Sequence, residues 1–128
     1  MQRQKFDLIT EDMILNSPET YIYIFGDNLE HRGFGGQAAV ARQFVKEGRA
    51  FGITTKRKPS NTDDSYFSDR KDEIDAVRKS FTQIRIFKKM GRKIIFFPHI
   101  GEGLSDLQRR SPMIYGMIRG FIESFNGD

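Results

Sequence analysis

Three short segments of the chain are rich in apolar and β-branched residues, and each is bounded by polar or glycine-containing stretches. They are Tyr21–Phe25, Ala50–Thr55 and Lys93–Phe97. Apolar runs of this length without polar alternation are typical of strands that other elements cover on both faces. We therefore predict three buried strands. The segment Phe6–Leu15 carries no strong pattern, and we predict a short strand or turn there.

Helical periodicity separates and follows these strands. The spacing of apolar residues predicts amphipathic helices over Asp72–Met90 and from Ser111-Pro112 to Phe125, the latter with serine at the N-cap and proline at the first helical position. A third helix is predicted over Gln37–Glu47, closed by Gly48. The segment Ser60–Asp69 is polar and aperiodic, and is interpreted either as a lid over a site or as a surface loop.

This alternation of strands and helices predicts the fold class. Strands that are apolar on both faces need helices on both faces. We expect residues 1–128 to form a single α/β domain, a three-layer α/β/α sandwich with a central mixed, largely parallel sheet.

Composition narrows the possible chemistry. Cysteine is absent, which excludes disulfides, thiolate metal sites and a cysteine nucleophile. The 21 basic residues exceed the 17 acidic ones by four, a balance that fits an anionic ligand, a nucleic acid or neither. No apolar run is long enough for a membrane helix and no signal sequence is evident, so a cytoplasmic protein without membrane contact is expected.

Two glycine-containing loops follow predicted strands, at Gly26–Gln37 and Pro98–Gln108. In parallel sheets ligands bind beyond the carboxyl ends of the strands, and a loop that leads into a helix offers free N–H groups to an anion. Two such loops side by side suit a diphosphate. Each loop taken alone is more often plain turn chemistry, and the two loops together favour ligand binding. A P-loop motif is absent, and the intervening segment DNLEHR separates the first strand from Gly33, which argues against a Rossmann dinucleotide site.

With these motifs the chain resembles the macrodomain family of ADP-ribose-binding modules. An apolar strand followed by Asn28, the glycine loop and helix GFGGQAAVAR, and the late segment KIIFFPHIGEGL carry the resemblance. It is similar to the branch of ADP-ribosyl-glutamate hydrolases and ADP-ribose 1''-phosphate phosphatases, and to small macro-like proteins of phages and bacteria. The resemblance implies the cytoplasm of a bacterium or of a phage-infected host cell.

The resemblance also implies site residues. Asp106, Lys56 and Asn28 are the catalytic candidates for hydrolysis at the distal ribose of an ADP-ribosylated macromolecule or of ADP-ribose 1''-phosphate. Neither a metal nor a cofactor is expected. The residues predicted to bind the ligand, many of them through the backbone, are Asp27, Gly33, Gly35, Gly36, Gln37, Ile100, Gly101, Gly103, Leu104 and Ser105.

Several alternatives stay open at this point. The strand alignment leaves either Thr55 or Lys56, and either Ser105 or Asp106, facing the pocket, because alternate strand residues point to opposite faces. A reader that binds ADP-ribose without turnover is the second hypothesis. A nucleic-acid-binding module is the third. It requires a contiguous basic face, and the scattered cations of the sequence disfavour it. Glu102, beside a bound diphosphate, is expected to turn its carboxylate away.

Overall fold

The computed structural model describes residues 9–33 and 38–126, and its centre is a parallel sheet of three strands. β1 (Tyr21–Asn28) lies between β2 (Ala50–Lys56) and β3 (Lys93–Phe96), in the order β2-β1-β3. The three predicted strands are therefore confirmed, and the protein has an α/β fold. All pairings between these strands are parallel, and the described antiparallel pairing is an isolated bridge between Lys56 and Tyr66.

The central strand is longer than predicted. Asp27 and Asn28, expected in a loop, continue β1 and pair with Thr54 and Lys56 of β2, with an irregularity in register between them. A charged residue is tolerated in this buried strand because Arg42 pairs with the Asp27 carboxylate.

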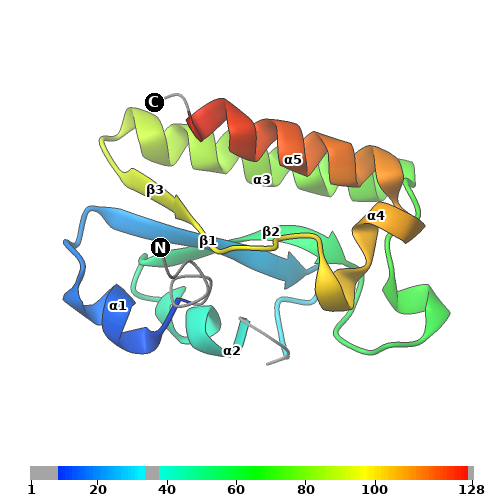
Figure 1. Cartoon of the computed structure of the whole chain (residues 1–128), viewed down its shortest axis with the longest axis horizontal. Coiled ribbons are helices and arrows are strands. Elements are labelled where there is room, and N and C mark those ends of the chain that lie inside the picture. The colour runs from blue at the N-terminus through cyan, green and yellow to red at the C-terminus, as the bar shows by residue number, and fades with distance from the viewer. Residues whose placement is uncertain (1–8, 34–37, 127–128) are drawn as a thin grey trace, which may run out of the picture.

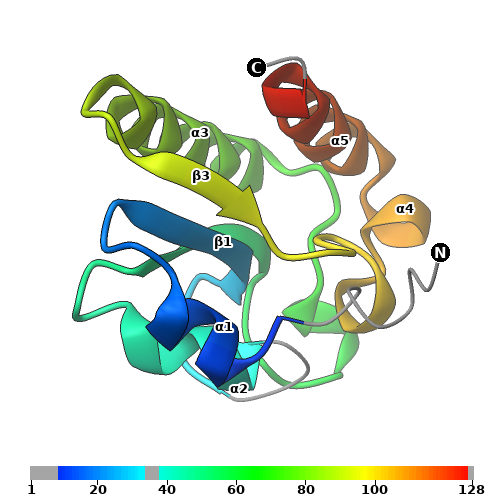
Figure 2. The same cartoon turned by 60° about the vertical axis from the view of Figure 1, so that its left-hand side comes forward.

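Helices lie on both sides of the sheet (Figure 1). α3 (Lys71–Lys89) and α5 (Pro112–Asn126) run side by side on one side, as both cartoon views show (Figure 2). α1 (Glu11–Asn16) and α2 (Ala38–Ala41) lie on the other side. The two long helices match the sequence prediction to within one or two residues. None of the described helices has the length and apolar character needed to cross a membrane.

Two predicted elements differ from the structure. Of the segment Phe6–Leu15, predicted as a short strand or turn, residues 6–8 lie outside the described residues and the remainder leads into α1. Thr10 caps this helix by accepting a hydrogen bond from the Met13 N–H, with Glu11 and Asp12 in the first turn. Of the helix predicted over Gln37–Glu47, the described residues form an α-helix only over Ala38–Ala41. After α2 the chain tightens into a 3₁₀ turn, η2 (Arg42–Phe44), and then turns toward β2.

Further short elements shape the loops around the carboxyl ends of the strands. They are the 3₁₀ turns η3 (Asp63–Ser65) and η4 (Gly103–Ser105) and the one-turn helix α4 (Leu107–Arg110). Asp69 follows η3 and caps α5 from outside, accepting hydrogen bonds from the N–H groups of Met113 and Ile114. These hydrogen bonds connect the segment after η3 to the start of α5.

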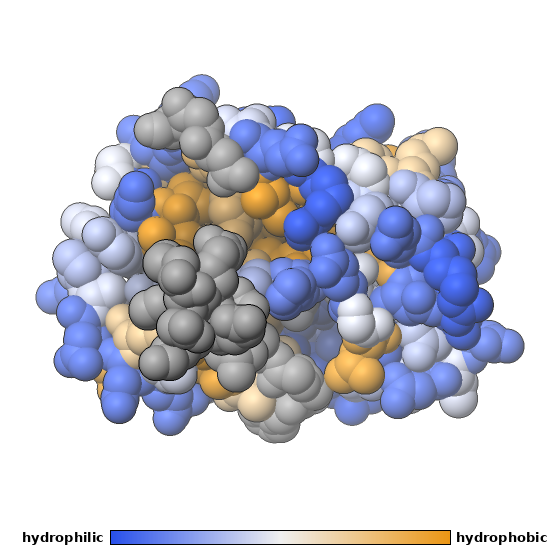
Figure 3. All heavy atoms as spheres, viewed as in Figure 1, coloured by the Kyte–Doolittle hydropathy of each residue, from blue (hydrophilic) through white to orange (hydrophobic). Residues whose placement is uncertain are grey.

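The core is packed mainly from the strands and the two long helices. The face seen in Figure 3 is largely polar, and its apolar atoms gather in a recess. Aromatic rings fill the space between the sheet and helices α3 and α5, where Phe81 and Phe121 stack with centroids 4.0 Å apart. The largest side chains with almost no exposure include Phe25, Ile22, Ile24, Ile53, Ile84, Ile114 and Ile118. Each such residue contributes roughly 1.5–3 kcal/mol of hydrophobic stabilisation.

Candidate ligand-binding site

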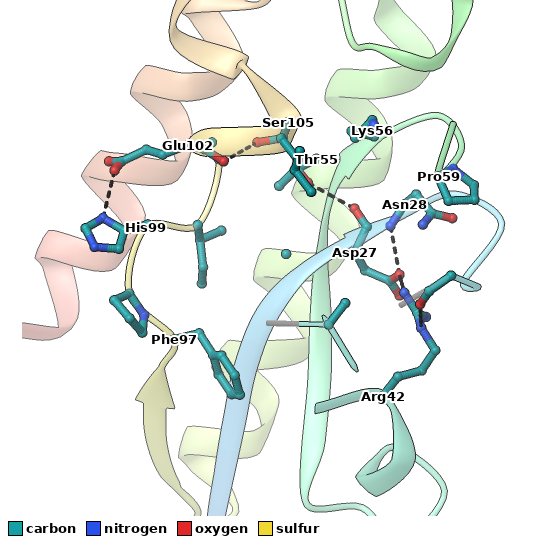
Figure 4. Close-up of a pocket in the computed structure, with 18 of the residues that line it drawn as sticks. Asp27, Asn28, Arg42, Thr55, Lys56, Pro59, Phe97, His99, Glu102 and Ser105 are labelled. Carbon is teal, nitrogen blue, oxygen red and sulfur yellow. Dashed lines mark hydrogen bonds and ion pairs between the residues drawn. The ribbon is translucent and has the colours of Figure 1, made fainter. Parts of the chain in front are cut away.

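A pocket of about 340 Å³ opens at the carboxyl ends of all three strands. Three walls form it: the end of β1, the end of β2 with Pro59, and the loop Phe97–Ser105 that follows β3 (Figure 4). This is the position at which parallel α/β sheets bind ligands. The predicted residues that line it are Asp27, Asn28, Gly33, Lys56, Ile100, Gly101, Gly103, Leu104 and Ser105.

The loop after β3 has an unusual backbone. His99, Gly101 and Gly103 adopt positive φ angles of 62°, 87° and 63°. Gly101 is needed for a second reason, because a Cβ there would lie 3.0 Å from Leu107 Cδ1. Among the described residues, no hydrogen bond uses the N–H groups of Ile100, Gly101 or Gly103. Free N–H groups in such a turn form a concavity that favours an anion.

Glu102 anchors this loop to helix α5. Its carboxylate accepts hydrogen bonds from the Tyr115 hydroxyl at 3.2 Å and pairs with His99 Nδ1 at 3.0 Å, while Arg119 of α5 donates to the Ile100 carbonyl at 2.8 Å. Burial acts to raise the pKa of Glu102, but the contacts with His99, Tyr115 and Arg119 outweigh it and hold the pKa below its usual value. Figure 4 shows the Glu102 side chain directed toward His99 and away from Asp27.

Asp27 and Arg42 form a buried ion pair on the opposite wall. Arg42 Nη2 lies 2.7 Å from Asp27 Oδ1, and the two side chains are 13% and 6% exposed. Arg42 Nε also donates to the Gly33 carbonyl at 2.7 Å, so the arginine joins the strand end to the start of the glycine loop. His31 Nδ1 contacts the second oxygen of Asp27 at 3.0 Å. Both oxygens of the Asp27 carboxylate are therefore already in contact with other residues of this chain.

Asn28 lines the pocket, but its amide shapes its own turn. Nδ2 donates to the Arg32 carbonyl at 2.7 Å, and Oδ1 accepts from the Glu30 N–H at 3.0 Å. An amide has two donors and two acceptor lone pairs, so one of each remains for a ribose hydroxyl.

The end of β2 brings both alternatives of the sequence prediction to the pocket. The Thr55 hydroxyl donates to the Asp27 carbonyl at 3.1 Å. The Lys56 ammonium donates to the Ser60 carbonyl at 2.8 Å and lies 4.6 Å from the centroid of the Tyr66 ring. Burial, and secondarily the positive charge of Arg110, lower the pKa of Lys56 below its usual value.

The structure does not bring Asp106 to the pocket that Thr55 and Lys56 line. Ser105 lines the pocket, whereas Asp106 is not among the lining residues. A positive φ of 50° precedes α4, and the Asp106 carboxylate pairs with Arg109 at 2.5 Å and Arg110 at 3.2 Å. Of the three catalytic candidates, Asn28 and Lys56 share the pocket and Asp106 stands outside it.

Some site residues escaped the sequence prediction, and others fall outside the structural description. Arg42 and Pro59 line the pocket but were not predicted; an arginine one turn into the helix after a glycine loop was the available signal for Arg42. The predicted residues Gly35, Gly36 and Gln37 lie outside the described residues. Within the described part of the chain, no group of three His, Asp or Glu side chains could hold a metal ion.

The chain was compared with family models, curated proteins and solved structures. A model for a family of unknown function (DUF7831) matches residues 5–121, a range that includes the whole pocket. No curated protein and no solved structure matches the chain.

Proposed function

The chain belongs to the DUF7831 family, whose function is unknown, and we propose that its pocket binds ADP-ribose in the manner of a macrodomain. The arrangement of helices on both sides of a parallel sheet suits the three-layer α/β/α architecture that this proposal entails. The pocket also lies at the strand ends where such a ligand would sit.

One observation carries the proposal: the N–H groups of Ile100, Gly101 and Gly103 are free in the described structure and belong to one loop at the pocket. Backbone N–H groups bind phosphate oxygens without the entropy cost of ordering long side chains. On this wall the Glu102 carboxylate is held by Tyr115 and His99 rather than left free beside these N–H groups. A diphosphate is the ligand group that such a wall would hold.

We further propose binding without turnover as the activity. A hydrolase of the lysine/aspartate type would need Asp106 beside the distal ribose. Here that carboxylate is neutralised by Arg109 and Arg110, outside the pocket. The Lys56 ammonium, in turn, donates to the Ser60 carbonyl. The carboxylates that line the pocket in the described structure, Asp27 and Glu102, are engaged by Arg42 and by His99 and Tyr115, so neither is free to activate water.

A pair of variants at Gly103 tests the proposal. Its φ of +63° is one that Asn and Asp adopt more readily than other side chains, and a Cβ there meets nothing within 4 Å. Gly103→Asp places a carboxylate beside the free N–H groups, and Gly103→Asn places a neutral side chain of the same shape there.

Calorimetric titration with ADP-ribose should give binding to the wild type and to Gly103→Asn. For Gly103→Asp we expect a loss of about tenfold or more, because a like charge near the diphosphate opposes binding. ADP and AMP serve as control ligands, and weaker binding of both would support a contribution from the distal ribose. Equal affinities of the Asp and Asn variants, or no heat with any of the three ligands, would refute the diphosphate assignment. Release of free ADP-ribose from an ADP-ribosylated protein would contradict the absence of turnover.

A further inference from the structure

Basic residues are concentrated in one segment of the chain. Residues 78–93 hold seven of the 21 Lys and Arg side chains and none of the 17 Asp and Glu side chains. The 14 basic residues elsewhere are outnumbered by the acidic ones, so the net positive charge of the protein originates in this segment. The segment covers the carboxyl-terminal part of α3 and the turn into β3.

Helical spacing gathers three of these cations on one exposed face. Arg78, Arg85 and Lys89 stand seven and four residues apart, with Thr82 between them, and all four are exposed. We call these four residues the basic face. Within the described structure Arg78, Arg85 and Lys89 pair with no carboxylate. The helix dipole favours Lys89 in the last turn of α3, but it does not act on Arg78, and like charges four residues apart repel one another, so helix stability does not account for the three cations together.

Arg85 is oriented without the use of its hydrogen-bond donors. Its guanidinium lies 5.0 Å from the centroid of the Phe121 ring, and no hydrogen bond to another described residue involves it. Phe121 in turn stacks on Phe81 in the core. A cation held by a buried ring keeps its planar donor fork available for a phosphate.

We propose that the basic face binds the phosphate backbone of a nucleic acid. From Arg78 to Lys89 the helix rises about 16 Å, which equals about five nucleotide steps measured along the axis of a duplex. Three cations over this length can contact three phosphates. Contacts of this kind are independent of base sequence.

The same helix is poorly suited to a membrane surface. A helix that lies on a bilayer inserts its apolar face. Most of the apolar face of α3 is already used, because Val77, Phe81 and Ile84 are buried in the core, and Ile86 is the one large apolar side chain of this helix that is exposed in the described structure. The basic face itself contains no apolar side chain, so a hydrated polyanion is the partner that it fits.

This surface is separate from the pocket. α3 runs antiparallel to the strands and leads into the amino end of β3, where Lys93 pairs with Tyr21 (Figure 1). The pocket lies at the carboxyl ends. The inference therefore does not depend on the proposed ligand, and it departs from the sequence-based expectation that scattered cations disfavour nucleic-acid binding.

Fluorescence anisotropy with a labelled 20-base-pair DNA duplex and with a single strand of the same length tests the inference. Three phosphate contacts predict a logarithmic salt slope of about −2.7 for the duplex, so the affinity should fall roughly forty-fold between 50 and 200 mM salt. Arg78→Glu, Arg85→Glu and Lys89→Glu should each weaken binding about fivefold or more and reduce the slope by about one.

Lys46→Glu is the matched control, because Lys46 is exposed in the turn that follows α2 and η2, far from α3 in the sequence, and the substitution changes the net charge equally. It should leave the slope unchanged. The inference fails if neither nucleic acid changes the anisotropy at 50 mM salt, or if Lys46→Glu weakens binding as much as the variants of the basic face. Binding to anionic phospholipid vesicles without binding to nucleic acid would also overturn it. Circular dichroism of each variant verifies that the fold is intact.

Discussion

At the scale of single residues, the buried carboxylate of Asp27 depends on Arg42. Asp27 lies inside a strand whose other residues are largely apolar, and its side chain is only 6% exposed. Arg42 supplies the opposite charge at 2.7 Å and at the same time holds the Gly33 carbonyl. One arginine therefore maintains both the strand end and the entry to the glycine loop.

Replacing Arg42 by methionine should lower the free energy of unfolding by about 3 kcal/mol, because the substitution leaves a buried charge without its main partner. Urea denaturation followed by circular dichroism measures the change. Arg32→Met is the matched control, since Arg32 pairs with Glu30 at an exposed position, and we expect a loss of less than about 1 kcal/mol. Adding Asp27→Asn to Arg42→Met should recover part of the loss. A change below about 1 kcal/mol for Arg42→Met would contradict the role of the ion pair.

At the scale of elements, Asp69 connects the segment after η3 to helix α5. It has a φ of 58°, and its carboxylate accepts hydrogen bonds from the N–H groups of Met113 and Ile114 and from the Ser111 hydroxyl. Burial acts to raise the pKa of Asp69, but these hydrogen bonds outweigh it and set the pKa below its usual value. The amino-terminal end of α5 is thus capped by a residue that lies 45 positions before Ile114 in the sequence.

Asp69→Asn should reduce the free energy of unfolding by about 1 kcal/mol at neutral pH, since it removes a charged cap while tolerating the positive φ. A depressed folded-state pKa contributes stability that is fully present above the unfolded value and is lost as the pH falls through the folded one. The difference between the two proteins should therefore shrink below about pH 4, near the pKa of an unperturbed aspartate. Urea denaturation at a series of pH values measures it. A difference that stays constant down to the lowest pH would show that the charge is not responsible.

The elements also show what could be predicted from the sequence. α3 and α5 were predicted nearly to the residue because each carries a long apolar stripe. The end of the sheet that holds the pocket was also predictable, because ligands bind beyond the carboxyl ends of parallel strands. The extension of β1 through Asp27 was not predictable, because it depends on a partner fifteen residues away. Similarly, the choice between Ser105 and Asp106 at the pocket depends on one positive φ angle, which the sequence pattern does not report.

At the scale of the whole molecule, the two ends of the sheet differ in chemistry. The carboxyl end holds the pocket, with free N–H groups and buried polar residues. The amino end lies beside the carboxyl-terminal part of α3, which carries Arg85 and Lys89 of the basic face. A ligand at the first end and a polyanion at the second would not compete for the same atoms, so we expect the two binding events to be thermodynamically independent.

Ligand binding at the pocket should stabilise the whole protein, because the walls come from β1, β2 and the loop after β3 and are assembled only in the folded chain. At a concentration one hundred times the Kd, a ligand that binds only the folded state adds about 2.7 kcal/mol of stability. For a domain of this size that corresponds to a rise in Tm of roughly 10 °C. Differential scanning fluorimetry with ADP-ribose measures it, and Gly103→Asn is expected to show a similar rise. A tenfold weaker Gly103→Asp should gain at most about 1.4 kcal/mol at the same concentration, so its rise in Tm should be about half that of the wild type or less. An equal rise for the Asp variant would mean that ADP-ribose stabilises the protein from somewhere other than the Gly101–Gly103 loop.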